Sequence, residues 1–296
     1  MFLLLGSPYD LCCTRVAWAL RALGHDADII ENPLTSPARL SWHLHDGGAD
    51  SRFFISQAAS TPTRLSGVLV RTAGWIDPAE WSAQDFPYAI AETQAALLAW
   101  LYSLSCPVVN RYDAGLWYRP RPPLAAWRAP LAQVGLEIPS TLLTNVPERA
   151  RAFGASAARR GAPGLVYTPL TGTATYLVAT DRDWAGVGAL QARAPVSLAI
   201  PHEEPERAVV IGDRVVWNGT PSDEAASLEP ALRQFAHHAA LTFVEVAVAR
   251  TADGIRVVSV DHQPRIETFD HSTQCGVVDA LVGALTSPIA AVRRAS

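Results

Sequence analysis

Short apolar runs separated by helical patterns make up the first third of the chain. Buried strands are predicted for the apolar run Phe2–Leu5 and again over 67–71 and 107–110. A long helix is predicted over 89–104, because apolar residues recur there at helical spacing and a proline follows. This alternation of strands and helices predicts an α/β layer at the N-terminus.

The rest of the chain mixes strands and helices without regular alternation, which favours an α+β fold. Residues 111–123 contain a proline- and arginine-rich break that regular structure cannot accommodate. Two strand pairs are predicted around glycine turns, one over 208–216 and one joining 243–249 to 255–260. We therefore expect three parts: an α/β domain over 1–110, a central lobe over 111–185 and a C-terminal lobe over 186–296.

The composition argues against several classes of protein. Hydrophobic residues make up 49% of the 296 residues and charged residues 18%, so the chain can bury a large core. A net charge of -4 argues against nucleic-acid binding, and no apolar run approaches the roughly 20 residues of a membrane span. No basic residue precedes the apolar start, and the four cysteines lack metal-finger spacing. We expect a cytoplasmic protein with reduced thiols.

The chain contains no lysine, since all 24 of its basic residues other than histidine are arginines. This absence excludes mechanisms that need an amine side chain, such as Schiff-base chemistry, a P-loop or a Ser–Lys dyad.

Several local strings, in a fixed order, resemble the ATP-grasp superfamily. The branch in question contains glutathione synthetase, the ribosomal-protein glutamate ligases and the peptide-maturing ligases of modified natural products. The strings are VLVR at 68–71 with VVN at 108–110, GLEIPST at 135–141, VYTPLTG at 166–172, RAVVIGD at 207–213, and Glu245 with VDHQP at 260–264. The resemblance implies an α/β N-terminal layer followed by α+β ATP-grasp-like lobes.

The resemblance also implies a chemistry, in which ATP phosphorylates a carboxylate and an amine then attacks the acyl phosphate. It assigns Mg²⁺ binding to Glu245, Asp261 and Gln263, and it gives Arg207 the stabilisation of the transferred phosphoryl group. Asp261 and Gln263 are two residues apart on a predicted strand, a spacing that places both side chains on one face.

Departures from the family pattern fall on the nucleotide site. Thr168 stands where the family has a phosphate-binding lysine, and an earlier lysine falls near Leu124, where Arg121 and Arg128 are the nearest cations. The adenine-binding hinge falls on the apolar string SLAI at 197–200. Each metal ligand is also exchanged for another oxygen-bearing residue. We therefore expect ATP to bind more weakly than is usual for the family, or not at all.

Three functions remain open on this basis. The first is an ATP-dependent carboxylate–amine ligase acting on a peptide or amino-acid substrate. The alternative is a catalytically degenerate homologue that serves as a peptide- or protein-binding partner subunit. A third is the same scaffold adapted to chemistry without a nucleotide. The resemblance also suggests a homodimer. Trp18 and Trp100 are predicted in the core, whereas Trp75, Trp81, Trp117 and Trp127 are candidates to line a substrate groove.

Overall fold

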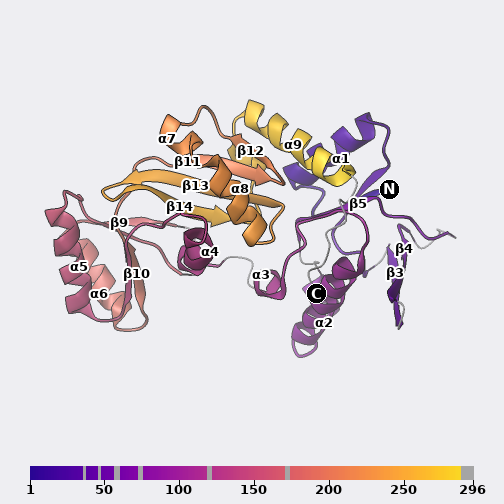
Figure 1. The fold of residues 1–296 in the computed structure, drawn as a ribbon. Coiled ribbons are helices and arrows are strands. Elements are labelled where there is room, and N and C mark those ends of the chain that lie inside the picture. Colours follow the sequence, from indigo (N-terminus) through magenta and orange to yellow (C-terminus); the bar gives the residue numbers. More distant parts are fainter. Residues whose placement is uncertain are drawn as a thin grey trace.

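The computed structural model describes residues 1–35, 38–45, 48–56, 61–72, 76–118, 122–170 and 174–287. Within these ranges the chain forms three four-stranded sheets and one two-stranded hairpin. Figure 1 shows the N-terminal sheet on the right, the central sheet on the left and the third sheet between them. No described helix is long and apolar enough to cross a membrane.

The N-terminal sheet is parallel and has the strand order β2-β1-β5-β6. Its strands and helices are β1 (Phe2–Leu5), α1 (Leu11–Ala22), β2 (Ala27–Ile30), β5 (Gly67–Val70), α2 (Phe86–Ser103) and β6 (Val108–Val109). Helix α1 begins after Asp10, whose carboxylate accepts a hydrogen bond from the Cys13 N–H at 3.1 Å and so caps the helix. The predicted α/β layer is confirmed.

An antiparallel hairpin of β3 (Arg39–His45) and β4 (Gly48–Phe54) was missed by the sequence pattern. It is attached to α2 through Trp100, whose indole N–H donates to Ser51 Oγ at 2.7 Å, and through the stacking of Phe53 near the same ring. A short 3₁₀ turn, η1 (Pro78–Glu80), precedes α2. The hairpin escapes prediction because its strands carry many polar and exposed residues.

The central sheet has the strand order β7-β10-β8-β9, and all of its pairs are antiparallel. Its elements are β7 (Thr141–Thr144), α5 (Pro147–Arg159), β8 (Leu165–Tyr167), β9 (Tyr176–Val178), α6 (Asp181–Gln191) and β10 (Val196–Ala199). The segment that leads into it forms α3 (Ala114–Tyr118), η2 (Leu124–Trp127) and α4 (Arg128–Ala132). This lobe has a separate small core around Leu165 and Leu198.

The third sheet is antiparallel, with the order β12-β11-β13-β14. Its elements are β11 (Glu206–Ile211), β12 (Arg214–Trp217), α7 (Asp223–Ala226), α8 (Glu229–His238), β13 (Phe243–Thr251), β14 (Gly254–Asp261), η3 (Ile266–Thr268) and α9 (His271–Thr286). Gly212 and Gly254 have φ values of +55° and +95° at the two tight turns, a conformation that glycine adopts without strain. Both predicted strand pairs are confirmed.

The expected boundary near residue 185 falls inside helix α6. Strand β10, which follows that helix, pairs with β7 and β8 in the central sheet. After helix α6 the chain returns to the central sheet as β10. This connection could not be predicted from the sequence, because strands and helices do not alternate regularly in this part of the chain. We propose instead that the central lobe ends between Ala199 and Glu206.

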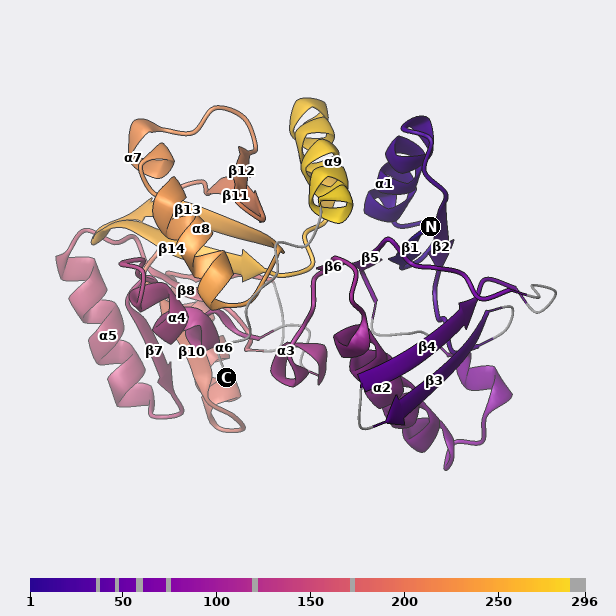
Figure 2. The ribbon, with the colours of Figure 1, turned by 45° about the vertical axis from the view of Figure 1, so that its right-hand side comes forward.

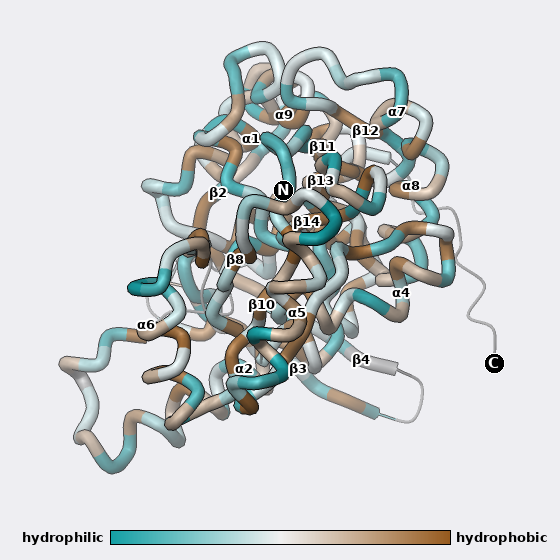
Figure 3. The backbone as a smooth tube through the Cα atoms, turned by 90° about the vertical axis from the view of Figure 1, so that its left-hand side faces the viewer, coloured by the Kyte–Doolittle hydropathy of each residue, from teal (hydrophilic) through white to brown (hydrophobic). Residues whose placement is uncertain are grey.

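The N-terminal and third sheets share their hydrophobic core. Helix α9 packs beside α1 and against β5 and β6, so the end of the chain returns to the first domain. Figure 2 shows α9 and α1 side by side above the two sheets. In Figure 3 the hydrophilic stretches lie mainly on outer turns, as a shared apolar interior requires.

Five of the six tryptophan predictions can be compared with the described structure. Trp100 is buried as expected, but Trp18 is 72% exposed on α1, so its prediction as a core residue was wrong. Trp117 and Trp127 are buried rather than lining a groove, because Trp117 packs near Tyr112 and Trp127 against Phe235. Trp81 is exposed, and Trp75 lies outside the described residues.

Candidate functional site

Two carboxylates face each other across neighbouring strands of the third sheet. Glu245 on β13 is the direct cross-strand partner of Asp261 at the end of β14. Directly opposed side chains in an antiparallel pair have Cβ atoms about 5 Å apart and share a face of the sheet. The carboxylates are therefore close enough to bind one cation together.

Arg207 on β11 lies on the other side of Glu245. Its Nε donates to Glu245 Oε1 at 2.6 Å, and its other nitrogens donate to the carbonyl oxygen and hydroxyl of Thr268 at 3.2 and 2.7 Å. The guanidinium also stacks over the Phe269 ring, 4.2 Å from its centroid. These contacts hold Arg207 firmly, with its charge beside one of the two carboxylates.

Gln263 follows Asp261 by two residues, in the segment after β14. Its backbone N–H donates to Asp261 Oδ1 at 2.8 Å, so the carboxylate itself orders the turn that carries the amide side chain. The Gln263 side chain also contacts the Tyr112 hydroxyl and lowers the pKa of that group, although burial dominates and raises the pKa to about 12. Gln263 thus lies at the junction of the third sheet and the N-terminal domain.

A buried polar cluster fixes that junction. Asn110 follows β6, and its amide nitrogen donates to the carbonyl oxygens of Phe243 and His262, while its oxygen accepts from the Thr242 and Phe243 N–H groups. The Tyr112 hydroxyl donates to the His262 carbonyl at 2.9 Å. These bonds attach the N-terminal sheet to the start of β13 and to the segment after β14. They thereby help to position Asp261 and Gln263, the two neighbours of His262.

His262 lies between Asp261 and Gln263 and is buried. Its ring packs edge-on against Tyr112, and its Nε2 has no hydrogen-bond partner. Burial lowers the pKa of His262, so the imidazole is neutral at pH 7. It supports the metal-side strand by packing.

The candidate phosphate residues lie elsewhere. Thr168 is half-buried just past β8, where its N–H donates to the Ser197 carbonyl of the neighbouring strand at 3.2 Å. Arg128 is exposed at the start of α4, and among the described residues it makes no ion pair. Arg121 lies outside the described residues. Among the described residues, no contact joins Thr168 or Arg128 to Arg207, Glu245 or Asp261.

The donor atoms around Asp261 suit a magnesium ion. Carboxylate and amide oxygens are ligands that Mg²⁺ accepts, and Glu245 on β13, Asp261 at the end of β14 and Gln263 in the segment after it would supply them. Within the part of the chain that the structure describes, no group of three or more His, Cys, Asp or Glu side chains could hold a metal ion.

Sequence reasoning missed Asn110 and Tyr112 as site residues. The string VVN at 108–110 was available as a signal, because a polar residue directly after a buried parallel strand lies at the edge where ligands bind. Its contacts with Phe243 and His262 span more than 130 positions of sequence and could not be read from local pattern.

The three sheets together form the ATP-grasp fold, which the chain adopts over nearly its whole length. The ligase PsnB, solved with its minimal precursor, Mg and ADP, matches with a TM-score of 0.74 and 22% identity over 97% of this chain and 98% of that one. The macrocyclase MdnC from Microcystis aeruginosa MRC, bound to precursor peptide MdnA, matches with a TM-score of 0.73 and 17% identity, covering 96% and 98%. A Chryseobacterium gregarium RiPP-associated ATP-grasp ligase, in complex with ADP and a leader and core peptide, matches with a TM-score of 0.72 and 14% identity, covering 96% and 95%. No protein-family model and no curated protein sequence matches the chain.

Proposed function

We propose that this protein is an ATP-dependent carboxylate–amine ligase that forms amide bonds on a peptide. The observation that carries the proposal is the cross-strand pair of Glu245 and Asp261, with Arg207 beside it, in the third sheet of an ATP-grasp fold. PsnB, MdnC and the Chryseobacterium gregarium ligase, which share this fold, were solved with precursor, leader or core peptides, and this supports a peptide substrate over a free amino acid.

The reaction proceeds in two transfers. A substrate carboxylate oxygen attacks the γ-phosphorus of ATP, the bond to the β-phosphate oxygen breaks, and ADP leaves. An amine then attacks the carbonyl carbon of the acyl phosphate, loses a proton, and expels inorganic phosphate. Arg207 would stabilise the negative charge on the phosphoryl group during the first transfer.

Glu245, Asp261 and Gln263 would hold a magnesium ion, which would supply positive charge to offset the charge of the nucleotide phosphates. In that role Glu245 contributes the carboxylate oxygen that Arg207 does not occupy, since the ion pair engages Oε1. The turn between Asp261 and Gln263 keeps both side chains at the end of β14.

Arginine replaces lysine in the rest of the phosphate site. Arg128 is the described candidate, because it is exposed on α4 and has no ion-pair partner among the described residues. Arg121 is the second candidate, seven residues earlier. A guanidinium binds phosphate through paired hydrogen bonds, but it is larger and more weakly hydrated than an ammonium group. The nucleotide site is therefore weaker than one that has two lysines.

Trapping of the acyl phosphate tests the proposal without knowledge of the natural amine. The protein is incubated with ATP, Mg²⁺, hydroxylamine and a pool of peptides rich in glutamate and aspartate. A ligase of this type produces peptide hydroxamates and ADP in equal amounts, and both require Mg²⁺. Nucleotide binding without hydroxamate from any acidic peptide would instead favour the degenerate, partner-binding alternative. The proposed setting is the cytoplasm, where ATP is available.

A further inference from the structure

Arg71 stands where the connections of the N-terminal sheet diverge. From β1 the chain passes through α1 to β2 on one side, while β5 pairs with β1 on the other. In open parallel sheets the crevice at the carboxyl ends of two such strands is the usual place for a ligand. Arg71 directly follows β5, and its backbone N–H donates to the Leu5 carbonyl oxygen at 2.7 Å.

The Arg71 side chain is buried but only partly satisfied. It is 6% exposed, and its Nε donates to Asp10 Oδ2 at 3.1 Å. Its Nη1 is buried and has no hydrogen-bond partner. A buried donor of a charged group that remains unpaired destabilises a folded protein, because its hydrogen bonds to water are lost and not replaced. The free protein therefore holds a charged donor that a ligand can satisfy.

Asp10 does not supply a hydrogen-bond acceptor for Arg71 Nη1. Its other carboxylate oxygen accepts the Cys13 N–H and caps helix α1. The neighbouring thiols do not supply a negative charge either, because burial raises the pKa of Cys12 to about 12 and that of Cys13 further. The Nη1 group of Arg71 therefore keeps N–H donors without a partner.

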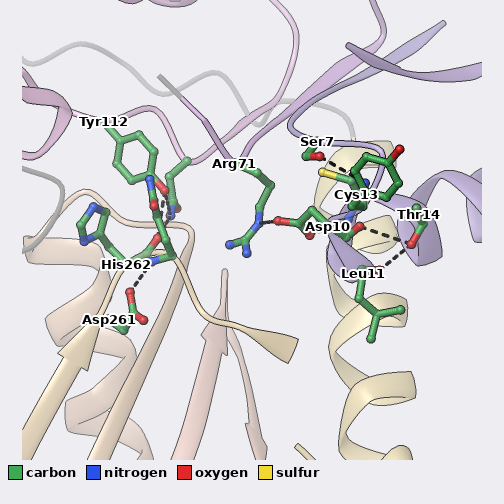
Figure 4. Close-up of polar contacts among 12 residues, drawn as sticks. Ser7, Asp10, Leu11, Cys13, Thr14, Arg71, Tyr112, Asp261 and His262 are labelled. Atoms are coloured by element: carbon green, nitrogen blue, oxygen red, sulfur yellow. Dashed lines mark hydrogen bonds and ion pairs between the residues drawn. The ribbon is translucent and has the colours of Figure 1, made fainter. Parts of the chain in front are cut away.

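The direction of the guanidinium connects it to the candidate metal site. It lies over the Phe243 ring, 5.8 Å from the centroid. Phe243 is two residues before Glu245 on β13, so the two side chains share a face about 7 Å apart. Figure 4 shows Arg71 between Asp10 on one side and Asp261, His262 and Tyr112 on the other.

The packing around Gly6 leaves room for the aliphatic part of the Arg71 side chain. A Cβ on Gly6, the residue after β1, would lie 3.1 Å from Arg71 Cβ and 2.5 Å from Cys13 Sγ. Only glycine leaves that space open, so the sequence of the β1–α1 turn is matched to the arginine.

We propose that Arg71 binds the carboxylate of the substrate peptide that the ligase activates. This inference rests on the proposed function for the fate of the carboxylate, but the binding itself needs no nucleotide. The fork geometry of Arg71 Nη1 and Nη2 matches the two oxygens of a carboxylate. Its position over the Phe243 ring, two residues along β13 from Glu245, would hold that carboxylate on the side of the sheet that carries the candidate metal ligands.

The test is a binding competition between matched peptides in the absence of ATP. One synthetic library carries a central glutamate, a second carries glutamine at the same place, and both have amidated C-termini. Mass spectrometry gives the ratio of bound glutamate to glutamine peptides. The wild-type ratio should be about tenfold or more. R71Q should reduce it to near unity, and R71K should retain only part of it, because a lysine keeps the charge but loses the fork.

Two further arms make the result decisive. R160Q removes an arginine of a surface ion pair with Asp253 and should keep the wild-type ratio. A third set of peptides has no acidic side chains but has a free C-terminus, and it is compared with the same peptides amidated at the C-terminus. If Arg71 binds the terminal carboxylate, the wild type should prefer the free C-terminus, and R71Q should abolish that preference. If R71Q does not fold, R71K provides the test by itself.

Two results would overturn the proposal. One is a wild-type protein that prefers neither the side-chain nor the terminal carboxylate. The other is an R71Q or R71K variant that keeps the full wild-type preference. Failure of the proposed function is a separate result. It would be seen as absent ATP binding by the wild type, measured by calorimetry, while the glutamate-to-glutamine ratio still depended on Arg71.

Discussion

Arg207 Nε donates a hydrogen bond to Glu245 Oε1 over 2.6 Å, so a cation of the protein occupies one oxygen of a carboxylate proposed to bind magnesium. The pair is partly buried, since 25% of the Arg207 side chain and 11% of the Glu245 side chain are exposed. Arg207 is also held by Thr268 and Phe269. The fixed positive charge of Arg207 would therefore oppose the positive charge of a metal ion at the proposed site.

Removal of Arg207 should strengthen metal binding while it weakens catalysis. R207Q frees Glu245 and removes a positive charge near the cation, which should raise Mn²⁺ affinity on the order of tenfold. Turnover in the hydroxamate assay should fall by at least about tenfold, because charge on the phosphoryl group is no longer stabilised. Electron paramagnetic resonance of Mn²⁺ titrations measures the affinity, and an unchanged affinity would show that Arg207 does not compete with the metal.

Loss of either facing carboxylate should weaken divalent-ion binding. E245Q and D261N each remove one anionic ligand, and we expect about a tenfold loss of Mn²⁺ affinity for each. D213N, in the exposed turn between β11 and β12, is the matched control and should bind as the wild type does. Equal affinities in all three variants would place the metal elsewhere.

The sequence predicted the third sheet well, because Glu245 and Asp261 lie on strands joined by a short glycine turn. Once Gly254 fixes that turn, the cross-strand register follows from counting residues, apart from one irregularity between Ala247 and Val248. The buried cluster of Asn110 and Tyr112 was not predictable, because its partners are distant in sequence. The roles of Arg128 and Thr168 also remain predictions, because a phosphate site depends on a ligand that selects among side chains.

Stability should decrease below pH 6.5 partly through His262. Burial lowers the pKa of this group in the folded state below its value near 6.5 in the unfolded chain. At a pH between the two pKa values, the unfolded chain binds a proton at His262 and the folded chain does not. His262 therefore contributes full stability above about pH 6.5, and that stability is lost as the pH falls. Each unit of pKa shift corresponds to about 1.4 kcal/mol.

Urea unfolding of the wild type and H262Q between pH 8 and pH 5 measures this contribution. The difference in unfolding free energy between the two proteins should shrink toward low pH. H271Q changes an exposed histidine at the start of α9 and serves as the control. A difference that is constant with pH would show that His262 is not held neutral by burial.

The four cysteines should differ sharply in reactivity. Cys275 is exposed on α9, whereas Cys12 and Cys13 are fully buried and burial raises the pKa of both thiols. Because the thiolate is the reactive form, Ellman's reagent should modify Cys275 fast, Cys106 slowly, and the other two only on unfolding. C275S should remove the fast phase. Fast modification of more than one thiol in C275S would contradict the packing of α1 against the sheet.

Titration of ATP into the protein by calorimetry, with and without Mg²⁺, tests the central claim most directly. We predict binding that is weaker than that of an ATP-grasp ligase with two phosphate lysines, that requires Mg²⁺, and that is lost in the E245Q/D261N double variant. Loss of Arg121 or Arg128 should weaken it further. Absence of any binding by the wild type would contradict the ligase account, and tight binding that survives the loss of both arginines would contradict the proposed phosphate site.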